Sequence, residues 1–256
     1  MKTAELYDGV VNWIRMWFAD KPANAPVVIG ISGGKDSTIC AALLADALGK
    51  ERVIGVMMPN GEQKDIADSE QVIRTLGIKG ITVNIGQAYD ALTLEIVKND
   101  LNGSPNALKD AYETNTPARL RMVTLYGIAA QVGGFVVNTC NLSESVVGWE
   151  TYGGDGFGDF SPLGKLTVDE VKSLGIYMQL PANLVEKAPS DGMCGATDED
   201  KLGFTYAELD NFIRDNRVND NIGRILELNR KSHFKHENIH IPTYDPGLPI
   251  SEKLNW

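Results

Sequence analysis

Cysteine is scarce in this chain of 256 residues, and the three cysteines cannot form a paired motif. Cys40, Cys140 and Cys194 are an odd number and lie far apart, so no CxxC occurs. This spacing argues against a disulfide framework, a zinc ribbon and a redox dithiol, and it fits a reducing compartment. We therefore expect a cytoplasmic protein.

Long apolar runs and basic runs are also absent. No stretch approaches the ~18–20 apolar residues that span a bilayer. The first residues lack the basic region and apolar run of a signal peptide. The formal net charge is -10, so the surface as a whole should repel a nucleic-acid backbone. Neither a membrane nor a nucleic acid is an expected partner.

Apolar segments of strand length alternate with segments of helical periodicity. This alternation predicts an α/β fold with a doubly wound, mostly parallel sheet flanked by helices, followed by a helical C-terminal portion. No repeat or long linker divides the chain, so we expect one domain over residues 1–256. Strands are expected at 27–31, 52–58, 80–84 and 134–138; helices at 4–18, 36–48, 64–76, 117–131, 167–175, 205–214 and 219–232; and a glycine-rich loop at 148–165.

A polar, glycine-rich turn, residues 32–37, joins the first strand to its helix. Backbone N–H groups at such a turn and at the helix N-terminus can bind a phosphate. The turn is not a Walker A loop, because Lys35 follows Gly33 and Gly34 too closely, and its sequence does not match GxGxxG. Taken alone, two adjacent glycines could also form a plain turn that binds nothing.

The side chains of the turn favour a phosphate and a metal. Hydroxyls of Ser32 and Ser37 can donate to phosphate oxygens, and Asp36 can hold Mg²⁺. The string SGGxDS after a buried strand resembles the pyrophosphate loop of the ATP pyrophosphatase superfamily, which has an adenine nucleotide alpha hydrolase-like fold. The resemblance implies ATP as co-substrate, catalytic roles for Ser32, Asp36 and Ser37, and ATP contacts along the whole turn. Those contacts would come from Gly30, Ile31, Ser32, Gly33, Gly34, Lys35, Asp36 and Ser37.

Further segments narrow the resemblance to ammonia-dependent NAD synthetases. They occur in the family's order and extend the similarity from residue 5 to about residue 232. The segments are NTPARLRM at 115–122, NTCNLSE at 138–144, YGGDGFGDFSPL at 152–163 and the stretch from KAPS at 187 to LGFTY at 206.

The resemblance assigns a second metal ligand and two more ATP contacts. Glu144 follows a strand, so it should lie at the same sheet edge as Asp36, and the family's matching glutamate binds Mg²⁺. Judged alone, Glu144 reads as a solvated glutamate at a helix start. Thr139 and Ser190 match ATP contacts, although either could instead be a helix cap.

The resemblance also indicates how the substrate, deamido-NAD, is bound. Arg119 and Asp159 match residues that contact it; alone they read as a helix-surface arginine and a turn aspartate. Tyr152 occupies a position where many members have a basic residue, and His236 aligns with the start of a C-terminal His-Lys-Arg motif. These four residues are the predicted substrate contacts.

The implied reaction activates the nicotinate carboxylate as an acyl adenylate, which ammonia then converts to the amide. The length leaves no room for an additional amidase domain, so free ammonia is the expected nitrogen donor. The chain departs from the family at Pro117, where a lysine is common, and at Val168, where an ATP-contacting lysine falls. Lys165 could take over the latter role. The family is dimeric, so a homodimer is expected.

Two other functions are weighed against this one. A tRNA thiolase should have catalytic cysteines and a basic RNA-binding surface, which this sequence lacks. A nucleotide sensor without catalysis should have lost the metal carboxylates, whereas Asp36 and Glu144 are both present. His233, His236 and His240 have a helical spacing that could form a metal site, but the nearby prolines indicate that the helix ends before His240.

Overall fold

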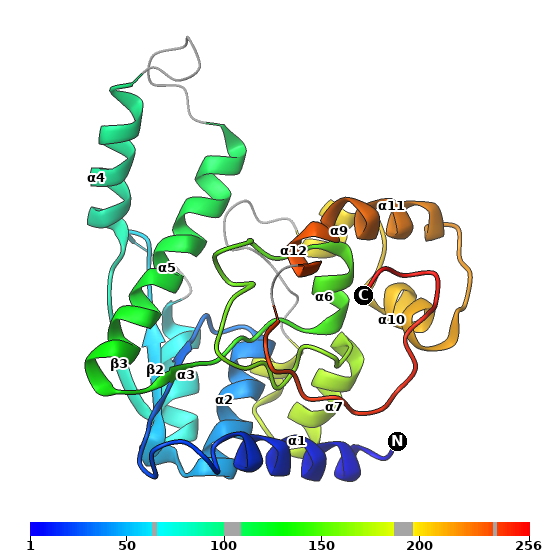
Figure 1. Cartoon of the computed structure of the whole chain (residues 1–256), viewed down its shortest axis with the longest axis horizontal. Coiled ribbons are helices and arrows are strands. Elements are labelled where there is room, and N and C mark those ends of the chain that lie inside the picture. Colours follow the sequence, from blue (N-terminus) through cyan, green and yellow to red (C-terminus); the bar gives the residue numbers. More distant parts are fainter. Residues whose placement is uncertain (63–65, 100–108, 187–196, 238–239) are drawn as a thin grey trace.

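The fold is built on a four-stranded parallel sheet, which lies at the left of the view in Figure 1. The computed structural model describes residues 1–62, 66–99, 109–186, 197–237 and 240–256. The strand order is β3-β2-β1-β4. The strands are β1 (Val27–Gly30), β2 (Val53–Met57), β3 (Lys79–Thr82) and β4 (Phe135–Val136). The strand order reverses between β1 and β4, because β2 and β3 lie on one side of β1 and β4 lies on the other. Open α/β sheets bind ligands at such a point, beyond the carboxyl ends of their strands.

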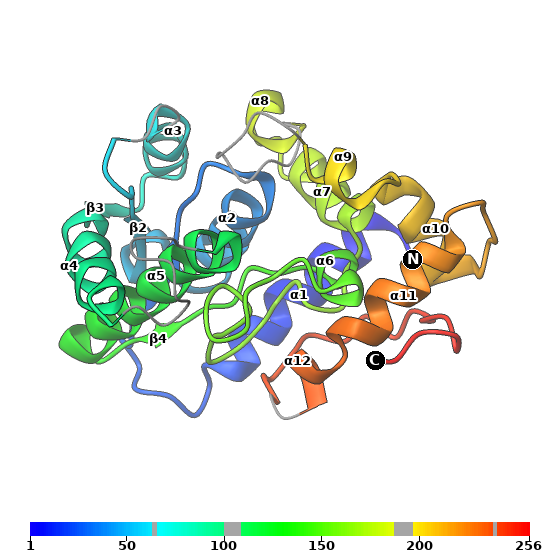
Figure 2. The ribbon, with the colours of Figure 1, turned by 90° about the horizontal axis from the view of Figure 1, so that it is seen from above.

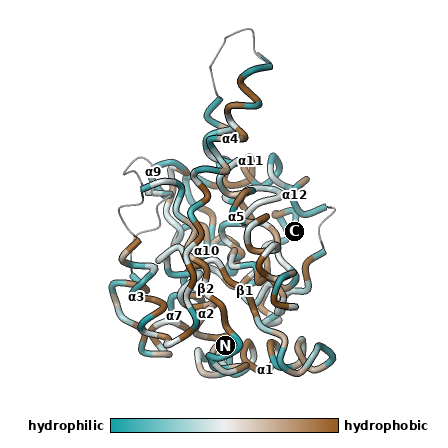
Figure 3. Tube along the Cα trace, turned by 90° about the vertical axis from the view of Figure 1, so that its left-hand side faces the viewer, coloured by the Kyte–Doolittle hydropathy of each residue, from teal (hydrophilic) through white to brown (hydrophobic). Residues whose placement is uncertain are grey.

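Both faces of the sheet are covered, which confirms the doubly wound α/β prediction. Val27 and Ile29 pack against α1 (Thr3–Trp17) and α2 (Lys35–Leu48), whereas Val28 packs with residues of α5 (Asp110–Val132). Successive side chains of a strand point to opposite faces of the sheet, so a strand with both faces covered must be apolar throughout. The remaining helix beside β2 is α3 (Ile66–Leu76). Figure 3 shows the strands as the hydrophobic centre.

The sequence prediction was wrong about several element boundaries. Proline favours the first turn of a helix, so Pro117 suggested a helix start, but α5 begins seven residues earlier, at Asp110. Helix α4 (Gly86–Val97) was not predicted; it stands beside α5 and projects from the body (Figure 1). Four short helices were missed as well. They are α6 (Leu142–Val147), α8 (Ala182–Val185), α9 (Asp198–Leu202) and α12 (Phe234–Glu237).

The predicted helical C-terminal portion is present and has its own core. Its main helices are α7 (Val168–Tyr177), α10 (Tyr206–Asp215) and α11 (Ile222–Ser232). Leu142 and Val146 of α6 are buried among side chains of α10 and α11. Figure 2 shows α6 between the sheet and these helices. Helix α6 therefore connects the carboxyl edge of the sheet to the C-terminal helices.

The predicted glycine-rich loop follows α6 and returns to the sheet. Val137 and Phe160 form an isolated parallel bridge. A Cβ on Gly158 would lie 2.6 Å from the backbone nitrogen of Asn138, so only glycine allows this close approach. The loop is thereby fixed against the end of β4. None of the helices in the described part of the chain combines the length and the hydropathy that a membrane span requires.

Candidate active site

The turn between β1 and α2 is organised by its own hydroxyl groups. The backbone N–H of Ser32 donates to Ser37 Oγ at 3.3 Å, and the N–H of Gly34 donates to Ser32 Oγ at 3.2 Å. The two serine Oγ atoms are 3.1 Å apart. Ile31 is buried and donates its N–H to Val56 O. Ile31 can therefore offer a ligand little beyond its carbonyl group, whereas the turn that follows is preorganised.

Gly33 is required by the backbone of the turn and by its surroundings. Its φ of +80° lies in the left-handed region, which disfavours residues with a side chain. A Cβ there would also lie 2.8 Å from Asp68 Cβ and 3.0 Å from the backbone nitrogen of Ser69. The turn before α2 and helix α3 thus meet at a position that only glycine can fill.

Asn141 holds the two predicted metal carboxylates close to one another. Its Nδ2 donates to Asp36 Oδ1 at 3.0 Å. Its Oδ1 accepts the N–H of Glu144 at 3.0 Å, and its own N–H donates to Glu144 Oε2 at 3.2 Å. These last two bonds form a capping box at the start of α6. Sequence reasoning placed Glu144 at the edge shared with Asp36 but missed Asn141, although an asparagine three residues before a glutamate signals this cap.

Lys35 is a buried cation beside these carboxylates. Its side chain is only 3% exposed, and its Nζ donates to Asp36 Oδ2 at 2.7 Å. Burial lowers the pKa of Lys35, but the charges of Asp36 and Glu144 outweigh it and leave this pKa above its usual value. The Nζ also lies 5.8 Å from the centre of the Tyr206 ring. The lysine is therefore an ammonium ion that faces the carboxylates rather than a solvated side chain of the turn.

The two carboxylates fit a hard divalent cation. Burial raises the pKa of Glu144 well above its usual value, and the charge of Asp36 raises it further, while Lys35 opposes both. A second positive charge at this place would stabilise the ionised pair. Mg²⁺ commonly uses one or two carboxylates and completes its shell with phosphate oxygens and water. The donor set of Asp36 and Glu144 is of this kind.

The predicted substrate contacts lie on the glycine-rich loop and next to it. Arg119 Nε donates to Tyr152 O at 3.1 Å, so these two predicted contacts are neighbours. Both side chains are exposed. Asp159 is different, because its two oxygens already accept hydrogen bonds from Tyr126 Oη at 3.2 Å and from the N–H of Val136 at 2.7 Å. A substrate role for Asp159 stays a prediction.

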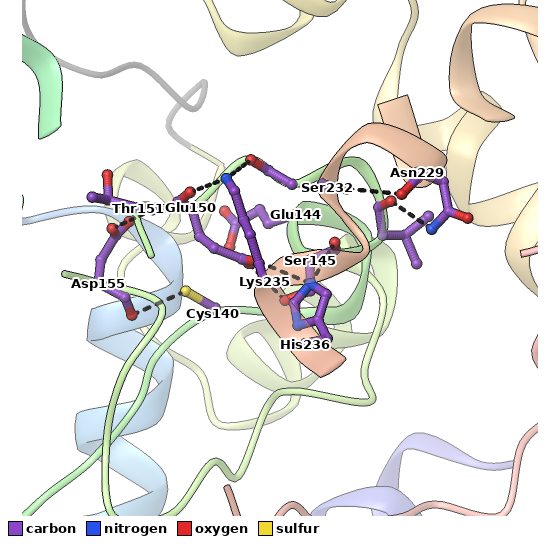
Figure 4. Close-up of polar contacts among 12 residues, drawn as sticks. Cys140, Glu144, Ser145, Glu150, Thr151, Asp155, Asn229, Ser232, Lys235 and His236 are labelled. Atoms are coloured by element: carbon purple, nitrogen blue, oxygen red, sulfur yellow. Dashed lines mark hydrogen bonds and ion pairs between the residues drawn. The ribbon is translucent and has the colours of Figure 1, made fainter. Parts of the chain in front are cut away.

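The remaining predicted residues have different surroundings. Thr139 follows β4 and is half-buried. Ser190 lies outside the described residues. Val168 is fully buried at the start of α7, and Lys165 is paired with Asp245 at 2.7 Å, so the predicted stand-in lysine is held elsewhere. His236 Nε2 lies 3.1 Å from Glu150 Oε1 and 3.1 Å from Ser145 O (Figure 4).

Sequence reasoning also missed Arg121, which lies at the carboxyl end of β2. Its Nε donates to Met58 O at 3.0 Å, and its side chain is partly buried. Burial lowers the pKa of this guanidinium, although an arginine remains charged in proteins. The sequence carried a signal for it, because Arg121 belongs to the same 115–122 segment as Arg119.

A glycine-rich turn and a pair of carboxylates therefore meet at the carboxyl edge of a parallel sheet. This combination of fold and site is that of the ATP pyrophosphatase class. The family model for NAD synthase matches residues 6–240 of the chain.

Relatives and solved structures agree with that match. The NH(3)-dependent NAD(+) synthetase of Carboxydothermus hydrogenoformans is 34% identical over 93% of this chain and 97% of its own length. That of Pyrococcus furiosus is 39% identical over 77% of this chain and 74% of its own. The structure of NMN synthetase from Francisella tularensis matches with a TM-score of 0.83 and 33% identity, covering 94% of this chain and 99% of its own. The chain belongs to the NAD synthase family.

Proposed function

We propose that this chain is an ammonia-dependent NAD synthetase that uses Mg²⁺. A carboxylate oxygen of deamido-NAD attacks the α-phosphorus of ATP, and the bond from that phosphorus to the departing pyrophosphate breaks. The nitrogen of ammonia then attacks the acyl carbon of the adenylate. AMP leaves, a proton is lost to solvent, and NAD is formed. The observation that carries this proposal is the position of the Asp36 and Glu144 carboxylates beside the turn of residues 32–37.

Residues of the turn would bind the pyrophosphate as it leaves. Backbone N–H groups of Gly33 and Gly34 and the hydroxyls of Ser32 and Ser37 point to this role, since preorganised donors stabilise developing charge without reorganisation. Phosphoryl transfer of this type needs positioning and charge neutralisation more than a protein nucleophile. Lys35 adds a fixed positive charge at the start of α2. Gly30 and Ile31 would contribute backbone only.

Asp36 and Glu144 would hold the magnesium ion. When bound, Mg²⁺ neutralises charge on the phosphate oxygens and orients them. Asn141 would keep both carboxylates in place through the bonds described above. Thr139 and Ser190 are proposed to contact ATP, and Arg119, Tyr152, Asp159 and His236 to contact deamido-NAD.

Ammonia as nitrogen donor is supported by the relatives that the chain matches over nearly their whole length, which are described as NH(3)-dependent. The expected assembly is a homodimer.

A second candidate substrate is nicotinate mononucleotide. The Francisella structure with the TM-score of 0.83 is that of an NMN synthetase. Both substrates present the same nicotinate carboxylate, so the chemistry at Asp36 and Glu144 would be identical. The two substrates would differ only in the contacts that the protein makes with the rest of the nucleotide.

The experiment is to measure AMP and pyrophosphate release from ATP and Mg²⁺ with ammonium, using deamido-NAD and nicotinate mononucleotide in parallel. We expect AMP release that depends on deamido-NAD and falls at least about a hundredfold in Asp36→Asn. Asp20→Asn is the matched control, because Asp20 is 79% exposed and pairs with its neighbour Lys21 on the surface. A higher kcat/KM with the mononucleotide would assign the second substrate. No AMP with either would reject the proposal.

A further inference from the structure

Helix α6, which carries Glu144, is held at its carboxyl end by side chains from the C-terminal part of the chain (Figure 4). The last carbonyl groups of a helix have no partner within that helix. Here three of the carbonyls at this end have donors that come from residues 229–236. The contacts are Asn229 Nδ2 to Val146 O at 2.9 Å, Lys235 Nζ to Gly148 O at 2.7 Å, and His236 Nε2 near Ser145 O at 3.1 Å.

Lys235 also reaches beyond the helix. Its Nζ donates to Glu150 O at 2.5 Å as well as to Gly148 O. One ammonium group thus ties the end of α6 to the start of the glycine-rich loop, which carries Tyr152. A positive charge at a helix C-terminus is favourable as well, because the helix dipole is negative there.

Two further contacts hold the same region. The Glu150 side chain is only 3% exposed; its Oε2 accepts the Ser145 hydroxyl at 2.8 Å, and its Oε1 lies 3.1 Å from His236 Nε2. Gly148 has a φ of +69°, and a Cβ there would lie 2.2 Å from Ser232 Cβ. The end of α6 is therefore packed directly onto the end of α11.

A movement at the carboxyl end of α6 would be transmitted to Glu144 near its start. The helix has six residues, so its ends are only about 9 Å apart. The backbone N–H of Trp149 donates directly to Glu144 O at 2.8 Å. A displacement of Gly148 and Trp149 would move the backbone of Glu144, and with it the carboxylate that faces Asp36.

We propose that Lys235 is a positioning residue for the metal site, which it supports by holding the end of α6 in place. This inference rests on the proposed function, because it assigns Glu144 to the cation. Lys235 touches neither the carboxylates nor the turn of residues 32–37 in any contact of the described residues. Its effect must pass through the backbone of α6.

The test is metal binding by Lys235→Met, which keeps the length of the side chain and removes its charge. Binding of Mn²⁺ to the full chain with ATP is measured by electron paramagnetic resonance, so the readout does not depend on turnover. Residues that orient metal ligands typically change metal affinity by about 10- to 100-fold, and we expect at least about a tenfold loss. Lys235→Arg should recover part of it.

Lys231→Met is the matched control. Lys231 lies four residues earlier on α11, and its side chain is 61% exposed and pairs with Glu227 on the surface. We expect its Mn²⁺ affinity to equal that of the wild type. In steady state, Lys235→Met should raise the Mg²⁺ concentration for half-maximal rate more than it lowers kcat at saturating Mg²⁺, which simple loss of folded protein would not do.

The outcomes separate the two proposals. If the wild type binds no Mn²⁺ with ATP, the metal assignment of the proposed function fails, and this inference fails with it. If the wild type binds Mn²⁺ and a cooperatively folded Lys235→Met binds it equally well, only the role of Lys235 is rejected. Should Lys235→Met not fold, Lys235→Gln, whose amide can still donate to one carbonyl, decides by the same criterion.

Discussion

The side-chain amide of Asn141 donates to the carboxylate of Asp36 across 3.0 Å, linking two residues 105 positions apart in the chain. The same side chain caps helix α6 through the N–H of Glu144. One amide therefore fixes the relative position of two turns that follow different strands. Both turns contribute to the proposed ATP and magnesium site. Substitutions at Asn141 can therefore separate the effect of its helix cap from the effect of its hydrogen bond to the Asp36 carboxylate.

Replacing Asn141 by aspartate should destabilise the metal-free protein more than replacing it by serine. Both residues can cap α6, but aspartate turns a donor to Asp36 into a third carboxylate. A hydrogen bond to a charged group is worth about 1.5–3 kcal/mol, and repulsion adds to its loss in Asn141→Asp. Thermal unfolding at pH 7.5 should rank wild type, Asn141→Ser and Asn141→Asp in falling order. Added Mg²⁺ with ATP should narrow the gap; equal melting temperatures for the two variants would contradict this ranking.

Replacing Gly33 by alanine should weaken ATP binding through both its backbone and its neighbours. A left-handed backbone costs a residue with a side chain about 1–2 kcal/mol, and the new Cβ would press on Asp68 at 2.8 Å. We expect at least about a tenfold loss of ATP affinity by calorimetry, which corresponds to about 1.4 kcal/mol. Gly133→Ala is the control, because Gly133 has a φ of +65° and nothing within 4 Å of its Cβ position. It should lose stability but retain ATP affinity.

Asp210 should make stability fall as the pH rises from about 4 to 6. Burial raises the pKa of this carboxyl to about 6, although bonds from the Ser143 hydroxyl and the N–H of Asp169 oppose the rise. The folded state then binds the proton more tightly than the unfolded state, so protonated Asp210 favours folding. The stabilisation is complete below the ordinary pKa of about 4 and is lost as the pH rises through about 6.

The measurement for Asp210 is urea denaturation of the wild type and Asp210→Asn across that range. Two pKa units correspond to about 3 kcal/mol, so the difference in unfolding free energy between wild type and variant should shrink by up to this amount between pH 4 and pH 7. The hydrogen bonds lost in the variant add an amount to this difference in unfolding free energy that does not change with pH. A difference that does not change with pH would show that the carboxyl titrates normally.

Truncating Phe160 should weaken the packing of the N-terminal helix α1 and lower the stability of the fold. Its ring is fully buried and stacks on Trp17 with a centroid distance of 4.3 Å. Phe160→Ala should cost about 3–5 kcal/mol of unfolding free energy, followed by tryptophan fluorescence in urea. Phe234→Ala, at a ring that is 55% exposed, serves as the comparison and should cost less than about 1 kcal/mol.

Much of the fold could be read from local patterns. The run of residues 27–31 has no polar side chain, as a strand covered on both faces requires. The helix starting near Asp36 was predicted to within one residue, since two glycines precede it. Helix α4 was not predicted because it projects from the body and presents apolar side chains such as Leu92 and Leu94 to solvent. Pro117 misled the prediction of α5 because proline is commoner in a first helical turn than inside a helix.

The sequence by itself determined the parallel sheet, the glycine-rich turn and the placement of Glu144 at the same sheet edge as Asp36, because each follows from residues that are neighbours in the chain or from strand direction. Only the tertiary structure decided that Asn141 joins the two carboxylates, that Lys35 is buried against them, and that Lys235 and His236 face the end of α6. Such contacts join segments up to 105 residues apart. They depend on how whole helices pack, and no periodicity in the chain encodes them.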